Sequence, residues 1–212
     1  MTDLTPLPTP EDIRRLHERY APSPQAFDAV HGHCVIVWRI AEQLLDALAA
    51  HGAPAPVDRD LVRAGCLVHD IGVYRLYGAG ADGGFDGAHY IRHGLLGHEI
   101  LAAEGLPEAL CRFCSHHTGV GLTKDDITRQ NLPLPPADYL AETPEERLVM
   151  YADKFHSKST PPKFLTPAAY TAAVRRFGED KADAFTHLRH AFGDPDVRAL
   201  SAAHGHRLVD AP

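Results

Sequence analysis

The stretch Leu67-Val68-His69-Asp70-Ile71-Gly72 ends an apolar run with a histidine, an aspartate and then a glycine. Val62, Cys66 and His69 share one face of a helix, because residues three or four apart lie above one another. Gly72 is typical of the residue that follows a helix end. The His-Asp pair is therefore predicted in the last turn of a buried helix. A carboxylate there must be hydrogen-bonded or metal-bound, and this stretch alone leaves both interpretations open.

Composition limits the classes of protein to which the chain can belong. Its 212 residues, 44% hydrophobic and 23% charged, are typical of one globular domain. No apolar run is long enough to span a membrane and no signal peptide begins the chain, so we expect a cytoplasmic protein that does not bind membranes. The net charge of −7 argues against nonspecific binding of nucleic acid. An anionic substrate would need a local metal or lysine cluster.

Helix start signals recur along the chain and predict an all-α fold. A capping residue stands before a proline at Thr9-Pro10, Ser23-Pro24, Thr143-Pro144 and Thr166-Pro167. The helix that opens at Pro24 is expected to reach about His51, ahead of Gly52 and Pro54, and further helices are expected over 58–71, 88–103 and 108–117. No strand-like alternation occurs. The glycine-rich stretch 78–87 indicates a mobile loop, either a lid or a simple connection.

Two of these predicted helices carry candidate histidines on or near their core faces. In the long helix, His33 falls roughly 60° from the centre of the apolar face and His31 roughly 100° on the other side. His33 is therefore the better inward candidate. His93 shares the core face of the helix over 88–103, whereas His98 is expected at the surface or behind the site.

Three further positions leave alternatives open. His116 and His117 both lie in the last turn of their helix, and periodicity does not choose between them. Asp153 lies off the apolar stripe of the helix that starts at Pro144, although an inward tilt would bring it to the core.

Cys111-x-x-Cys114 would allow a zinc site, but it lacks a second cysteine pair and lies in a helical pattern. The four cysteines are interpreted as buried thiols, and the histidines near the C-terminus as surface residues: His187, His190, His204 and His206.

The inward candidates together offer four imidazoles and two carboxylates from five separate helices. They are His33, His69, Asp70, His93, His117 and Asp153. This set of nitrogen and oxygen donors suits Fe, Mn, Zn, Co or Ni. Its size is right for two divalent ions bridged by one carboxylate, with water completing each coordination sphere.

The order of these residues resembles the HD-domain superfamily of metal-dependent phosphohydrolases. A histidine, a His-Asp pair and a distal aspartate match its minimum, and two further histidines match its dinuclear branch. The local contexts match as well: His33-Cys34-x-x-Val37, HDIG at 69–72, His93-x-x-x-Gly97 and His117-Thr118-Gly119-Val120-Gly121. The last context favours His117 over His116. The resemblance covers roughly residues 25–160 and leaves the C-terminal quarter unmatched.

The resemblance implies a helical bundle and a metal site. It divides the chain into a leader with a short helix (1–22), an HD domain (23–160) and a helical C-terminal extension packed on the same domain (161–212). One ion would be held by His33, His69, Asp70 and Asp153. Asp70 would bridge to a second ion, which His93 and His117 complete.

The implied activity is hydrolysis of a small phosphate ester or nucleotide by a metal-activated water, with Asp70 in the catalytic centre. Lys154 and Lys158 would assist at the phosphate, as part of a positive cluster with His156 and Lys163; for Lys163 we favour ordinary helix-end electrostatics.

The sequence departs from many phosphodiesterases of the superfamily, which continue HDIG with a lysine that touches the phosphate. Val73 stands there instead, and the Gly-Tyr-Pro string of that branch is absent. Some members with the same six ligands are di-iron oxygenases, of which some use a tyrosine upstream of the first histidine, as Tyr20 is here. A non-catalytic, metal-stabilised binding domain is the third hypothesis.

Overall fold

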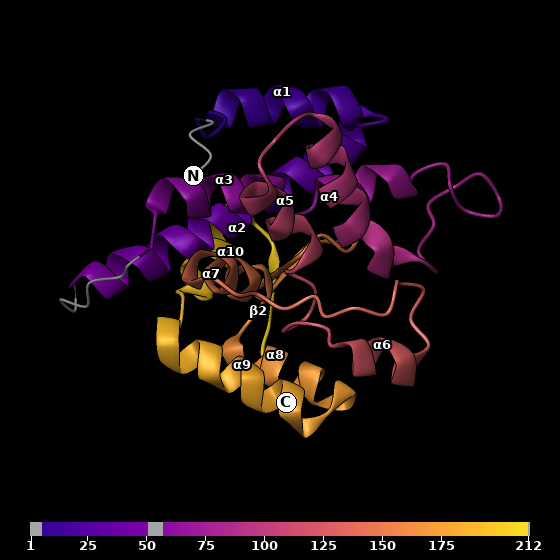
Figure 1. Cartoon of the computed structure of the whole chain (residues 1–212). Helices are drawn as coiled ribbons and strands as arrows, with labels where there is room; N and C mark the ends of the chain where they lie inside the picture. The colour runs from indigo at the N-terminus through magenta and orange to yellow at the C-terminus, as the bar shows by residue number, and fades with distance from the viewer. Residues whose placement is uncertain (1–5, 51–56, 212) are drawn as a thin grey trace.

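The computed structural model describes residues 6–50 and 57–211, and it is predominantly helical (Figure 1). Helix α2 (Pro24–Ala50) packs against α3 (Arg59–Val68) and α7 (Pro144–Asp153), and α4 (His93–Ala103) packs against α5 (Glu108–Ser115). Figure 1 shows α1 (Pro10–Tyr20) and α9 (Glu179–Phe192) on opposite sides of these helices. The all-α expectation is thus confirmed for the body of the fold. No helix of the described residues is long and apolar enough to cross a membrane.

The predicted helix starts are confirmed by their caps. The side chains of Thr9, Thr143 and Thr166 each accept a hydrogen bond from a backbone N–H of the first turn, and a proline follows each of them. Thr123 caps α6 (Lys124–Gln130) in the same way. These caps satisfy N–H groups that have no partner within the helix, and for that reason they are readable from local sequence.

Two helices have bounds that differ from the predicted ones, α4 at its start and α5 at its end. Helix α4 begins at His93, after the short 3-10 helix η2 (Tyr90–Arg92), and α5 ends at Ser115. The predicted end of the long helix at His51 lies outside the described residues, as do Gly52 and Pro54.

Gly72 does not end a helix, contrary to the prediction. Helix α3 already ends at Val68, and Gly72 lies inside the 3-10 helix η1 (Ile71–Leu76). A Cβ atom at this position would lie 2.0 Å from the carbonyl oxygen of His93 and 2.2 Å from the backbone nitrogen of Gly97. Glycine is therefore needed because the backbones of η1 and α4 touch here, and this contact places His69-Asp70 beside His93.

Three short strands were not predicted. β1 (His156–Ser157) pairs antiparallel with β2 (Lys163–Leu165), which pairs in parallel with β3 (Arg207–Val209). Two or three residues are too few to show alternation, so only the tertiary fold reveals them. The pairing of β1 with β2 spans the proposed domain boundary at residue 160.

The C-terminal segment packs on the helical bundle around this sheet. It contains α8 (Pro167–Val174), the 3-10 helix η3 (Arg175–Phe177), α9 and α10 (Val197–His204). Tyr151 of α7 packs on Phe185 and Phe192 of α9, and its hydroxyl donates a hydrogen bond of 2.7 Å to the carbonyl oxygen of Gly193.

Candidate metal centre

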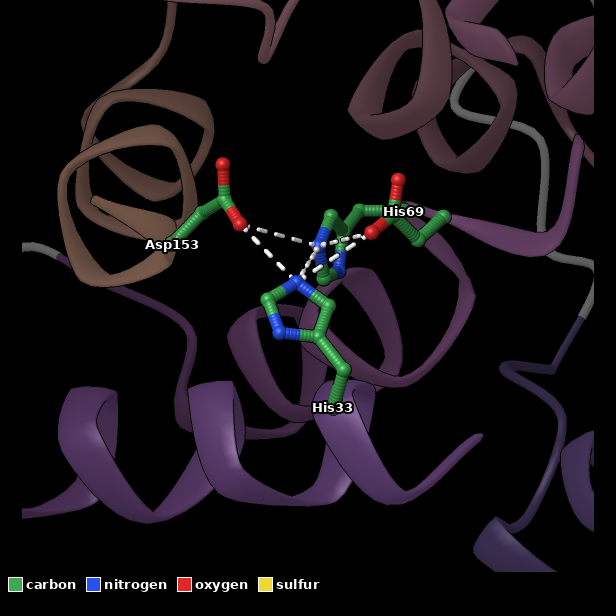
Figure 2. A group of neighbouring side chains, drawn as sticks. His33, His69 and Asp153 are labelled. Carbon is green, nitrogen blue, oxygen red and sulfur yellow. Dashed lines mark hydrogen bonds and ion pairs between the residues drawn. The ribbon is translucent and has the colours of Figure 1, made fainter. Parts of the chain in front are cut away.

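The six predicted site residues lie together, in two groups that share Asp70. The first group is His33, His69, Asp70 and Asp153, and the second is Asp70, His93 and His117; in each, one donor atom per residue lies within 4.8 Å of the others. Figure 2 shows His33, His69 and Asp153 pointing toward one another from separate segments. They come from the middle of α2, the end of α3 and the last residue of α7.

The first group is a close set of imidazoles and carboxylates. The Nε2 atom of His33 lies 3.0 Å from Oδ1 of Asp153 and 3.1 Å from Oδ2 of Asp70. The Nε2 atom of His69 lies 3.3 Å from that of His33 and 3.5 Å from both carboxylates. Taken alone, these distances also suit a hydrogen-bonded cluster without metal.

The second group does not suit such a cluster. The Nε2 atoms of His93 and His117 lie 3.1 Å apart, and they are 3.3 and 3.7 Å from Oδ1 of Asp70. That oxygen is buried and has no hydrogen-bond partner among the described residues. A buried carboxylate oxygen without a partner is costly unless a cation fills the space beside it.

Backbone carbonyls fix which ring nitrogen carries the proton. The Nδ1 atoms of His69, His93 and His117 lie 2.8, 2.7 and 2.7 Å from the carbonyl oxygens of Cys66, Tyr90 and Cys114. A carbonyl oxygen only accepts, so each Nδ1 bears the hydrogen. Burial lowers the pKa of His93 and holds that of His117 well below its usual value.

The neutral rings of His93 and His117 therefore direct two Nε2 lone pairs at each other and at Asp70. A cation between them would turn this repulsion into coordination. The donor set fits divalent transition metals that accept imidazole and carboxylate ligands.

The two aspartates are ionised, and each is paired with a lysine. Burial alone would raise the pKa of Asp70, but Lys158 and the neighbouring histidines together outweigh it and hold that pKa well below its usual value. Lys158 Nζ pairs with Oδ2 of Asp70 and lies 5.3 Å from the centre of the Tyr90 ring. Burial and Lys154 act in the same opposed way on Asp153, whose pKa is also held well below its usual value.

The other lysine, Lys154, is buried and fully engaged. Its Nζ donates to Oδ2 of Asp153 at 2.6 Å and to the carbonyl oxygen of His117 at 2.9 Å. Lys154 thus links the segments that carry Asp153 and His117. Both lysines line the cavity over the site.

The structure corrects two expectations, that His156 belongs to a positive cluster and that His206 is a surface residue. The two Nδ1 atoms of His33 and His156 lie 2.8 Å apart, and His156 Nε2 lies 3.1 Å from His206 Nδ1. Burial lowers the pKa of His156 to about 2, so this ring is neutral and adds nothing to the positive cluster. His206 is half-buried against it and is not a simple surface residue, whereas His187, His190 and His204 are exposed as predicted.

A cavity of about 870 Å³ opens over both groups. Its lining includes Lys158, Val73 and three aromatic side chains, Tyr77, Phe85 and Tyr90. Phe85 belongs to the glycine-rich stretch 78–87 and packs edge-on against Tyr77, with ring centres 5.0 Å apart. The stretch therefore contributes a side chain to the wall of the cavity.

The residues that the sequence analysis did not choose as metal ligands lie outside the two groups. His31 stacks on Phe27, and His98 bonds to Ser115. His116 lies 2.7 Å from the Ser115 hydroxyl, outside both groups, so the choice of His117 from its local context agrees with the geometry. The hydroxyl of Tyr20 donates to Glu104.

The cysteines are buried and free, as interpreted. The thiols of Cys111 and Cys114 donate to the carbonyl oxygens of Leu106 and Val68. Among the described residues, no candidate metal group contains both of them.

The sequence model of the HD domain family matches residues 30–158, which hold all six residues of the two groups. The chain belongs to the HD domain family. An uncharacterized protein of Methanocaldococcus jannaschii, MJ0778, is 40% identical over 121 residues, which are 57% of this chain and 62% of that protein. A tRNA (cytidine(56)-2'-O)-methyltransferase of Picrophilus torridus is 33% identical over 135 residues, 64% of this chain but 33% of the enzyme. The chain thus spans less than two thirds of either relative.

Solved structures support the HD fold. The HD domain of the phosphodiesterase PgpH of L. monocytogenes superposes with a TM-score of 0.53 at 16% identity, covering 91% of this chain and 98% of that one. The same domain in complex with cyclic-di-AMP gives a TM-score of 0.52 at 16% identity, covering 93% and 99%.

Proposed function

We propose that this HD protein is a metal-dependent phosphohydrolase that acts on a small phosphate ester or nucleotide. The observation that carries the proposal is the second group, in which two facing imidazole lone pairs and an unpartnered carboxylate oxygen lie beneath a cavity that also holds Lys158. Membership of the HD family and the fold shared with a phosphodiesterase support it.

In this proposal His33, His69, Asp70 and Asp153 hold one ion, and Asp70, His93 and His117 hold the other. Two divalent ions in these positions would supply an activated water and offset the charge of a phosphate. The carbonyls that fix the tautomers of His69, His93 and His117 keep each Nε2 aimed inward. His156 does the same for His33, because its Nδ1 can accept the hydrogen on Nδ1 of His33.

The two lysines have different roles in the proposal. Lys154 positions Asp153, because its ammonium group is already held by that carboxylate and by the carbonyl oxygen of His117. Lys158 binds the substrate, because it lines the cavity and its partner Asp70 would share its charge with the ions. A phosphate oxygen then takes the place of that carboxylate as the partner of Lys158.

The test is phosphate release from a panel of phosphate esters and nucleotides by protein loaded with Mn(II) or Fe(II), beside oxygen consumption with Fe(II). Lys158→Ala should raise KM for a phosphorylated substrate about tenfold or more, because it removes a charge-assisted contact. Metal content and Tm should stay unchanged. Lys124→Ala, which removes an exposed lysine outside the cavity, is the matched control.

Oxygen consumption without phosphate release would refute the phosphohydrolase and favour the di-iron oxygenase. If Lys158→Ala lost stability at unchanged kinetics, the lysine would be structural only.

A further inference from the structure

The C-terminal quarter of the chain, which lies beyond the HD match, builds the outer wall of the cavity. Strand β2 contributes Lys163 and Leu165, α8 contributes Tyr170 and Ala173, and η3 contributes Arg176. The last three are spaced by three residues, so they form one face of the helical segment. Phe85 of the glycine-rich stretch 78–87 lines the same cavity.

Two cations of this wall, Lys163 and Arg176, have no acidic partner among the described residues. Lys163 lies in strand β2 and not at a helix end, so its interpretation as helix-end electrostatics is wrong. Within residues 6–50 and 57–211, neither side chain makes an ion pair or hydrogen bond, and the Arg176 guanidinium lies 4.6 Å from the centre of the Phe177 ring. The neighbouring Arg175 shows the contrast: its Nε pairs with Glu179 at 3.1 Å, and it does not line the cavity.

The lining of the cavity carries more cationic side chains than carboxylates. Its described lining holds two carboxylates, Asp70 and Asp153, and each of them already has a lysine as its ion-pair partner. Lys163 and Arg176 are therefore in excess, in a chain whose net charge is −7. A positive field at this point of an acidic protein would attract an anion.

These two cations are close to the metal centre without belonging to it. Lys163 pairs with Ser157 in the β1–β2 ladder, next to Lys158. Tyr170 and Arg176 line the same cavity as Asp153 of the metal centre. Burial raises the pKa of Tyr170 most, the charge of Asp153 raises it further, and that of Arg176 lowers it. A ligand that extends through this cavity from the metal centre to its outer wall would meet Arg176.

We infer that Lys163 and Arg176 form a second anion subsite, and that the substrate is a phosphate ester with a second anionic group on its leaving part. The inference rests on the proposed function for the first phosphate. The second group, a phosphate or a carboxylate, is bound by Lys163 and by the guanidinium of Arg176, which suits two oxygens at once. The C-terminal quarter thereby selects the substrate.

The test compares pairs of compounds that differ in one anionic group. Glycerol 3-phosphate is compared with 3-phosphoglycerate, which adds a carboxylate, and adenosine 5′-monophosphate with adenosine 3′,5′-bisphosphate, which adds a phosphate. The metal-loaded protein is assayed for phosphate release, and binding is measured separately by calorimetry. Arg176→Ala and Lys163→Ala are each expected to raise the Kd and KM of the doubly anionic compounds about tenfold, and those of the singly anionic compounds by less than about twofold. Arg175→Ala is the matched control and should change neither.

One pair adds a carboxylate and the other adds a phosphate, so comparing them identifies which second anionic group the subsite binds. Equal KM or Kd values for the two members of every pair in the wild-type protein would overturn the inference, as would an equal loss for both members in the variants. Selective binding of the doubly anionic compounds, lost in the variants but accompanied by no phosphate release, would keep the subsite and refute the proposed hydrolysis.

Discussion

Replacing Gly72 by alanine should break the backbone contact that brings the two halves of the candidate metal centre together. The new Cβ would lie 2.0 Å from the carbonyl oxygen of His93, 2.2 Å from the nitrogen of Gly97 and 2.8 Å from its Cα. All three are backbone atoms, so relief requires η1 and α4 to separate. Overpacking of a well-packed core costs about 1–3 kcal/mol and sometimes more, and backbone overlap this severe should reach at least about 3 kcal/mol. That is a large share of an ordinary domain stability of about 5–15 kcal/mol.

Alanine substitutions at two other glycines should change the free energy of unfolding by different amounts, and they serve as comparisons. Gly32 lies within α2 with no atom within 4 Å of an added Cβ, so Gly32→Ala should stabilise the protein by about 0.5–1 kcal/mol. At Gly97 the Cβ would meet the side chain of Cys114 at 3.0 Å, and an intermediate loss is expected. Urea denaturation gives the three free energies of unfolding. A Gly72→Ala protein within about 1 kcal/mol of wild type, or a reversed order, would refute the close-contact argument.

Three further predictions concern metals and pH. Elemental analysis of protein purified without chelators should give more than one divalent ion per chain. His93→Ala should lower this value, whereas His190→Ala, at an exposed histidine outside the candidate metal groups of the described residues, should not. A wild-type value at or below one would leave a mononuclear site. Asp70→Asn should lose metal most completely, because Asp70 belongs to both groups. The pKa of Asp126 is lowered to about 2, since its bonds to Lys181 and Thr123 outweigh the opposite effect of burial. This stability, about 2 kcal/mol, should be present above about pH 4 and lost as the pH falls toward 2. Acid denaturation of Asp126→Asn should lack that loss.

The sequence predicted the parts of the fold that depend on local chemistry. A threonine before a proline specifies a helix start within one turn, so the starts at Pro10, Pro144 and Pro167 could be read directly. The ends were harder, because a helix ends where tertiary contacts take over. Gly72 illustrates this difference: it has the residue type of a helix stop, but the reason for it is a contact with α4, which follows twenty residues later in the chain.

The six residues of the candidate metal centre were proposed from the sequence as a set and lie together in the structure, but their partners could not be predicted. Helical faces indicated His33 and His93, and the resemblance to the HD family was needed to choose His117 and to include Asp153. His156 had no signal of its own, because its partners are His33 and His206, which lie far away in the chain. Arg176 had no signal either, because it differs from the adjacent Arg175 in features that only the fold shows: it lines the cavity, and no acid pairs with it among the described residues.

The departure at Val73 has a structural counterpart in the same cavity. Val73 is buried and apolar, so residue 73 brings no cation to the metal centre. Lys158 lines the same cavity, and it comes from the turn between β1 and β2, far along the chain from HDIG. That turn is held by β2, whose other edge pairs with β3. Lys158, the lysine beside Asp70, is therefore held in place by the C-terminal segment. The cavity stays positive although residue 73 is a valine, because this lysine and the strands that hold it come from a part of the chain beyond HDIG.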